Sequence, residues 1–229
     1  MNDYLNIGKE IYKSFLNMPM DPTTILPFVQ HPIFETCTLY DGEGLFDAMQ
    51  DKERYEKFKN TLKKNIDECD NLSKLVGRIR KSYRLTYISF LWDYGVDKKV
   101  CGNLLGEQWT SIETLTYDVN VKPRRVLSII KNVDKEHFMD TKEHEVYNNL
   151  PNELTIYRGC RTKGGVKACS WTLSKEQAKW FANRYNQNGY VFMAKIKKKD
   201  VIAYKSDRSE KEIVADYTKL YDIIDITEQ

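Results

Sequence analysis

The order of short apolar runs in the last third of the chain most constrains the fold. Residues 154–157 follow a Pro-Asn step and have the length and composition of a strand. A second short run covers 168–172, and residues 190–196, 201–204 and 213–215 favour three more strands. Between the second and third runs lies a segment with helical spacing. The sequence therefore predicts a β-rich region that contains one helix.

That helix has a start signal and one apolar face. Ser174 is typical of an N-cap residue, and Gln177 three positions later completes a capping-box pattern. The apolar residues that follow lie at i, i+3, i+4 and i+7, and they are Ala178, Phe181, Ala182 and Tyr185. We expect this face to pack on the strands.

The upstream sequence is helical in pattern. Apolar residues recur every three or four positions over 51–80, residues 85–92 indicate a buried helix, and 100–117 indicate another. Pro123 suits the first turn of a helix over 124–132. Four prolines crowd the irregular segment 19–32. We expect an α+β fold, with a mainly helical lobe over 1–150 and a β-rich core over 151–229.

Composition excludes several classes of protein. The 229 residues are 41% hydrophobic and 30% charged, which is typical of a soluble globular protein. Neither a membrane-spanning apolar run nor a basic-then-apolar leader is present, so we expect no membrane insertion and a cytoplasmic location, or delivery without a cleaved signal. The five cysteines are odd in number and widely spaced, which favours reduced thiols.

Metal and Rossmann-type nucleotide motifs are also missing from the sequence. The three histidines lack HExxH spacing, so we expect no metal site. The glycine-containing turn 41–44 has no preceding strand and no third glycine, and no Walker A motif occurs. A dinucleotide that binds this chain would therefore bind outside a Rossmann fold.

Three short signals follow one another in the β-rich core. Arg158 and Gly159 end the first strand, a Ser-Trp-Thr step runs from Ser170 to Thr172, and a Glu-x-Glu pair precedes an apolar run. Each signal alone has a simpler structural explanation, because a strand-end arginine and a Glu-x-Glu pair are more often solvated surface. In this order, the chain resembles the mono-ADP-ribosyltransferases of the Arg–Ser–Glu group, the toxin-type and clostridial-type enzymes. The resemblance covers roughly the last third of the chain.

The resemblance implies a fold, a cosubstrate and a set of roles. The fold would be a helical lobe packed against a small split β-sandwich, and NAD would be the cosubstrate. Arg158 would bind the NAD phosphates, and Gly159 would hold the nicotinamide amide through its backbone. Ser170 would orient the catalytic glutamate, Glu212. Thr172 stands where the family more often has serine, and it keeps the hydroxyl.

Two further residues follow the Ser step along the predicted helix. Phe181 would stack on nicotinamide, and Arg184 would make a second phosphate contact. Without the resemblance, Phe181 would more often be a core residue, and Arg184 would as readily be a plain surface residue.

The chemistry of glycosidic bond cleavage fits these residue types. Breaking the bond to nicotinamide leaves an electron-poor ribose, which the carboxylate of Glu212 would stabilise. The planar guanidinium of Arg158 suits a pyrophosphate. Glutamates at i and i+2 on a strand share a face, so Glu210 would orient or deprotonate the incoming nucleophile. In the family, the loop 205–209 before this pair would recognise the target.

The acceptor stays open at this point. A glutamate at position 210 resembles the members that modify arginine, so a toxin or effector that acts on a protein arginine is favoured. The alternatives are transfer to a nucleic-acid base, NAD hydrolysis, or a non-catalytic binding module. Basic clusters at 122–125 and 197–199 are compatible with nucleic acid, but the net charge of +3 is mild. Family habit also suggests a cognate inhibitor or antitoxin as partner.

Overall fold

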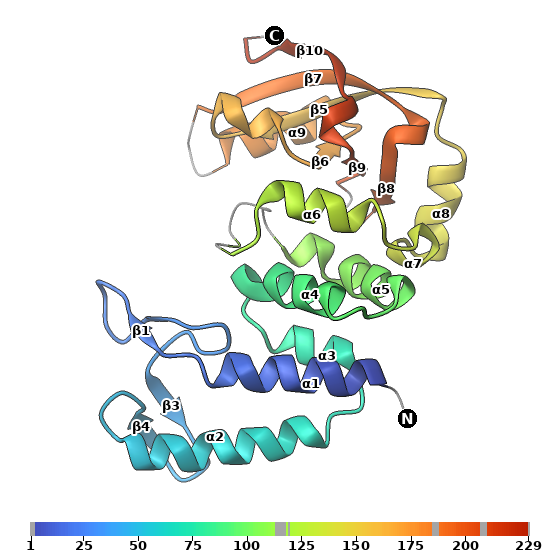
Figure 1. Ribbon diagram of the computed structural model, residues 1–229. Coiled ribbons are helices and arrows are strands. Elements are labelled where there is room, and N and C mark those ends of the chain that lie inside the picture. The colour runs from blue at the N-terminus through green and yellow to red at the C-terminus, as the bar shows by residue number, and fades with distance from the viewer. Residues whose placement is uncertain (1–2, 113–117, 119, 185–187, 207–209, 229) are drawn as a thin grey trace. The chain divides into compact units, whose positions relative to one another are not determined.

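The computed structural model describes residues 3–112, 118, 120–184, 188–206 and 210–228. Tyr185, the loop positions 207–209 and the end of the helix expected over 100–117 lie outside these residues. The fold is α+β, and the chain divides into two compact units (Figure 1). Unit 1 contains Met1–Asp97 and Glu107–Lys122, and unit 2 contains Lys98–Gly106 and Pro123–Gln229.

In unit 1, three helices pack on α1 (Asp3–Leu16). They are α2 (Lys52–Asp67), α3 (Leu72–Gly77) and α4 (Arg84–Asp93). Gly8 allows a close approach, because a Cβ there would lie 2.2 Å from Leu72 Cδ2, and the Tyr87 hydroxyl donates to its carbonyl at 2.7 Å. The predicted helix over 85–92 is confirmed, and most of α4 is buried.

The single apolar repeat over 51–80 forms two helices rather than one. Asp51 caps α2 by accepting a bond from the Arg54 amide, and Asn71 caps α3 by accepting one from the Ser73 amide. Because Asn71 is extended at φ −147°, the helical path is interrupted although the apolar spacing continues through the break. A short 3-10 helix, η1 (Lys81–Tyr83), then leads into α4.

The proline-containing segment and the residues that follow it form small antiparallel strand pairs. β1 (Asp21–Pro22) pairs with β2 (Val29–Gln30), and β3 (Thr38–Tyr40) pairs with β4 (Leu45–Asp47). The predicted turn at 41–44 is confirmed, and Gly42 adopts φ +103° there. The strands were missed because each has two or three residues, too few to show alternation.

In unit 2, six antiparallel strands form one sheet in the order β10-β7-β5-β6-β9-β8. They are β5 (Glu153–Cys160), β6 (Ser170–Thr172), β7 (Tyr190–Lys197), β8 (Val201–Lys205), β9 (Glu212–Ala215) and β10 (Tyr221–Asp225). The five predicted strands are confirmed, and β10 was missed because it is mostly exposed. β5 and β6 pair at a single position, Tyr157 opposite Thr172. The sheet is therefore two three-stranded halves joined at one residue pair.

Helix α9 (Lys175–Asn183) lies against β5 and β7 (Figure 1). Ser174 is its N-cap, since its side chain accepts a bond from the Gln177 amide at 3.1 Å. In the expected capping box, the Gln177 side chain would accept a bond from the Ser174 amide. That amide instead donates to the Thr172 hydroxyl at 3.0 Å. The buried residues Ala178 and Ala182 form its packing face.

The compact units do not divide at residue 150. Unit 2 includes most of α5 (Lys98–Gln108), and all of α6 (Pro123–Ile130), α7 (Lys135–Phe138) and α8 (Thr141–Asn148). A Cβ on Gly102 or Gly106 would lie 2.8 Å or 2.6 Å from the backbone oxygens of Asp134 and Phe138. Lys131, directly after α6, donates to Asp216, directly after β9, at 2.6 Å. These contacts are long-range in sequence, so the helical pattern alone could not show which compact unit these helices belong to.

Among the described residues, no helix combines the length and apolar character needed to cross a bilayer.

Candidate functional site

Three neighbouring strands of the sheet carry the central residues of the sequence prediction. Arg158 lies on β5, and Glu212 is the first residue of β9. Ser170 is the first residue of β6 and Thr172 is the last. β6 lies between the other two strands in the sheet. Thr172 is opposite Tyr157 on one side and opposite Glu212 on the other. Residues separated by 54 positions in sequence are thus brought into one region of unit 2.

Arg158 joins the strand to two neighbouring backbone segments. Its Nε donates to the Gly165 carbonyl at 2.7 Å, and its Nη1 donates to the Ser170 carbonyl. These neutral acceptors use two of the five N–H donors of a guanidinium. Burial lowers the pKa of Arg158, while Cys160, Glu212 and Cys169 raise it. The charge of Glu212 therefore acts on the guanidinium across the intervening strand.

The Thr172 hydroxyl links the end of β6 to the loop before β9 and to the N-cap of α9. This buried hydroxyl donates to the Glu210 carbonyl at 2.7 Å and accepts the Ser174 amide bond at 3.0 Å. Thr172 is also opposite Glu212 in the sheet, whereas Ser170 is opposite Val214. Direct neighbours have Cβ atoms about 5 Å apart and diagonal ones about 7–8 Å apart. By register, Thr172 rather than Ser170 is therefore the direct cross-strand neighbour of Glu212 on β6.

The two glutamates do not share a strand. β9 begins at Glu212, whose side chain is buried, and Glu210 lies half-buried in the preceding loop. Lys211 between them adopts φ +47°, a left-handed conformation, and its carbonyl accepts the Leu173 amide bond at 3.1 Å. The period-2 argument that put both glutamates on one face therefore does not apply. The Thr172 bond still fixes the backbone of Glu210 beside the end of β6.

A buried ion pair lies next to Glu212 and was missed in the sequence. Lys205 is opposite Glu212 in the sheet, and its Nζ lies 2.8 Å from Glu143 Oε2. The second oxygen of Glu143 accepts the Ser206 amide bond at 2.9 Å. Glu143 also completes the capping box of α8 with Asp140. The Asp-x-x-Glu spacing at 140–143 is typical of a helix capping box, but nothing in the sequence linked Glu143 to Lys205.

Gly159 is required for helix packing. A Cβ there would lie 1.8 Å from the Ala178 carbonyl oxygen and 2.6 Å from the Ala182 amide nitrogen. We expected the glycine to allow close approach of a ligand, but on this face of β5 the approaching group is the backbone of α9. Any contact between Gly159 and a ligand would have to use the backbone groups in the plane of the sheet.

Phe181 and Arg184 lie at the far end of α9. Phe181 is half-buried and packs edge-on against Trp180, with ring centroids 5.0 Å apart. The Arg184 guanidinium lies 5.5 Å above the Trp180 ring, and Arg184 is the C-cap residue of the helix. Trp180 is 55% exposed. The sequence analysis did not single out Trp180, which joins the two predicted residues into one aromatic and cationic surface.

The cysteines of this region are protonated packing residues. All five cysteines are buried, and none of them forms a disulfide. Burial raises the pKa of Cys160, and it raises the pKa of Cys169 to about 12. A thiolate nucleophile would need the opposite shift. Within the described part of the chain, no three potential metal ligands gather in one place.

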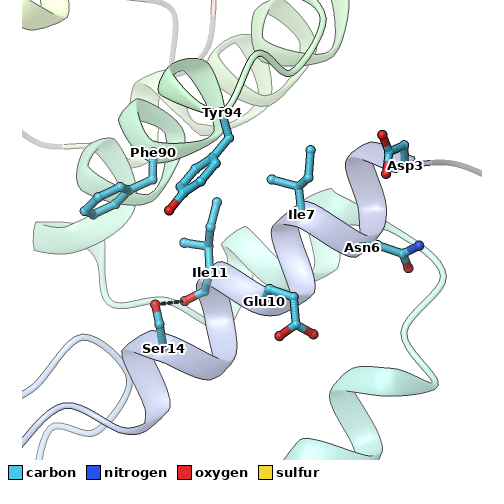
Figure 2. Close-up of a pocket in the computed structure, with 8 residues that line it drawn as sticks. All are labelled: Asp3, Asn6, Ile7, Glu10, Ile11, Ser14, Phe90 and Tyr94. Carbon is cyan, nitrogen blue, oxygen red and sulfur yellow. Dashed lines mark hydrogen bonds between the residues drawn. The ribbon is translucent and has the colours of Figure 1, made fainter.

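Unit 1 has a separate hollow between α1 and α4, with a volume of about 390 Å³. Figure 2 shows Phe90 of α4 and Tyr94, the C-cap residue of α4, opposite Ile7 and Ile11 from α1. Phe90 is 43% exposed and Tyr94 is 65% exposed. The lining contains none of the residues that the sequence analysis selected.

No protein-family model, no curated protein and no solved structure matches this chain.

Proposed function

We propose that the chain is a mono-ADP-ribosyltransferase that cleaves NAD and transfers ADP-ribose to a macromolecular acceptor. One observation carries this proposal: Arg158, Ser170 and Glu212 lie on three adjacent strands of a single sheet. The division of that sheet into two halves that meet at Tyr157 and Thr172 supports a split β-sandwich of the ADP-ribosyltransferase type.

The residues present fit the polar groups of NAD. The bonds of Arg158 to two carbonyls hold its guanidinium in one orientation, and three N–H donors are left over for phosphate oxygens. Glu212 is buried, so its carboxylate would act on a developing positive charge with little screening by solvent. NAD, when bound, supplies the ribose carbon at which the glycosidic bond breaks. Phe181 and Arg184 would provide the nicotinamide stack and the second phosphate contact.

The acceptor follows from Glu210 and the loop before it. We propose a protein arginine, because a second carboxylate beside Glu212 would orient a cationic nucleophile and take up its proton. The Thr172 hydroxyl donates to the Glu210 carbonyl, which holds the backbone of Glu210 beside the end of β6. Transfer to a nucleic-acid base and hydrolysis of NAD are alternative outcomes of the same cleavage. A toxin or effector role with a cognate inhibitor belongs to the same proposal.

The deciding experiment uses the purified chain with NAD labelled on its adenylate half, with and without a cell lysate. We expect wild-type protein to release nicotinamide and to label macromolecules. Glu212→Gln keeps the shape of the side chain and removes its charge, so nicotinamide release should fall by about 10²–10³-fold. Glu145→Gln, an exposed change on α8, is the matched control and should be unaffected.

A second variant separates the two glutamates. We expect Glu210→Gln to lose transfer to arginine while it keeps much of the NAD hydrolysis, because Glu210 acts on the acceptor rather than on the ribose. Equal loss of both activities in the Glu210→Gln and Glu212→Gln variants would refute this division of roles. Protease or nuclease sensitivity of the labelled product then identifies the acceptor as protein or nucleic acid.

A non-catalytic binding module is the competing hypothesis. It predicts no nicotinamide release under any condition, and no difference between wild type and Glu212→Gln in a growth assay on expression. That result, with both proteins folded by circular dichroism, would refute the proposed enzyme activity.

A further inference from the structure

Unit 1 has a second hollow, of about 540 Å³, where α3, η1 and α4 follow one another. We call it the 78–84 pocket. Its lining contains Ile33, Glu35, residues 77–82, Arg84 and Ile112. Its volume is within the range of pockets that hold a ligand the size of a nucleotide.

The lining of the 78–84 pocket is strongly cationic. It includes Arg78, Arg80, Lys81 and Arg84, which lie within seven consecutive residues. Glu35 is the one carboxylate among the described lining residues, and it is 3.8 Å from Arg80 Nε with a side chain that is 72% exposed. Four positive charges and one negative charge leave three positive charges in excess around one hollow.

Neutral groups hold two of these cations in place. Arg84 donates to the Gly77 and Ile79 carbonyls, to Gln108 Oε1 at 2.9 Å and to Ser111 Oγ at 2.8 Å. Arg80 Nη1 donates to the carbonyls of Val29, His31 and Phe34 at 3.0 to 3.3 Å. These carbonyl, amide and hydroxyl acceptors satisfy hydrogen bonds without cancelling charge. Burial also lowers the pKa of Arg84, and among the described residues no carboxylate forms an ion pair with its guanidinium.

The remaining two cations have freedom to adjust to a ligand. Arg78 and Lys81 are exposed, one on each side of the buried Ile79. Half-buried Ile33 and Ile112 add an apolar wall to the same hollow. The pocket thus combines fixed positive charge, mobile positive charge and an apolar surface.

We propose that the 78–84 pocket binds the phosphate groups of a nucleotide, either a free nucleotide or one within an RNA strand. Guanidinium groups match phosphate oxygens bidentately, and a phosphate carries more charge than a single carboxylate. The apolar wall suits the base or sugar next to that phosphate. This proposal is independent of the NAD site, because all of its residues belong to unit 1.

The test measures binding to the full chain at 150 mM salt with four probes: inorganic pyrophosphate, ADP, a ten-nucleotide single-stranded RNA and a polyglutamate peptide. The Arg78→Gln/Lys81→Gln variant changes two exposed residues, so it should fold normally, which circular dichroism verifies. Lys52→Gln/Lys64→Gln removes the same charge from two exposed positions on α2 and is the matched control. Arg78→Gln/Lys81→Gln should match wild type in the nicotinamide-release assay, because both residues belong to unit 1, and this separates the pocket from the proposed enzyme site.

We expect Arg78→Gln/Lys81→Gln to weaken phosphate binding at least tenfold, and the control less than twofold. Binding of pyrophosphate and ADP identifies a free nucleotide as the ligand, and binding of RNA alone identifies a strand. No binding of any phosphate probe at millimolar concentration would overturn the proposal. Equal loss in the two double variants, or polyglutamate binding as tight as RNA binding, would overturn it as well, because either result indicates unspecific attraction to charge.

Discussion

Gly159→Ala tests whether this glycine serves helix packing. The added Cβ would lie 1.8 Å from the Ala178 carbonyl oxygen, and real Cβ atoms do not come closer than 3.0 Å to such an atom. The backbones of α9 and β5 would have to separate by about 1.2 Å, the difference between these distances. The atoms nearest to the added Cβ are backbone atoms of Ala178 and Ala182, so rotation of a side chain cannot relieve the contact. We expect a loss of about 3 kcal/mol or more in the free energy of unfolding of unit 2, at the upper end of the cost of overpacking.

Chemical denaturation and amide hydrogen exchange measure this loss. Gly164→Ala is the control, because its added Cβ would find Thr162 Oγ1 at 3.9 Å as its nearest neighbour, an ordinary contact. Exchange should accelerate in β5 and α9 for Gly159→Ala and stay unchanged for Gly164→Ala. If Gly159→Ala unfolds within 0.5 kcal/mol of wild type, a threshold set by the usual effect of surface changes, the packing argument is refuted. In that case, a specific loss of NAD cleavage would restore the ligand explanation for this glycine.

Two further predictions concern buried charge. Glu143→Ala should destabilise unit 2 by about 3–5 kcal/mol in urea denaturation, because it leaves the Lys205 ammonium buried without its carboxylate. The double variant Glu143→Leu/Lys205→Met removes both charges and should cost much less. Similar losses in the two variants would contradict this reason. Burial lowers the pKa of His31 to about 4, so the folded state favours the neutral ring. This preference stabilises the fold above pH 6.5, the ordinary pKa of histidine, and the stabilisation is lost as the pH falls toward 4. The free energy of unfolding should therefore drop by about 2 kcal/mol more between pH 7 and pH 5 in wild type than in His31→Asn. The asparagine keeps an acceptor for the Ile33 and Phe34 amides. An equal drop in the two proteins would exclude His31 as the source.

Local patterns were sufficient for most elements of the sheet. The strands β5 to β9, the Ser174 cap and the proline at the start of α6 are set by residues within a few positions of one another, through alternation, capping and the fixed φ of proline. β10 could not be predicted in this way, because four of its five residues are exposed and its pairing with β7 is irregular.

The candidate site shows a similar limit. Motif order selected Arg158, Ser170, Thr172 and Glu212, and the fold does bring their strands together. The sequence could not show that Thr172 is opposite Glu212, because the register depends on how β6 pairs with β9. The left-handed Lys211 was equally hidden, since lysine rarely adopts a positive φ and its presence there depends on the bond to Leu173.

The sequence by itself determined the α+β class, the strand order along the chain and the residue types available for phosphate and ribose chemistry, because these follow from short-range pattern and side-chain composition. Tertiary structure decided which residues are neighbours. It assigned Gly159 to the packing of α9, paired Lys205 with Glu143 over 62 positions, and brought Ile33 and Ile112 to the cations of 78–84 in one hollow of unit 1. Contacts of this kind depend on the packing of whole elements, and the free energy of that packing is a property of three-dimensional neighbours that no local spacing records.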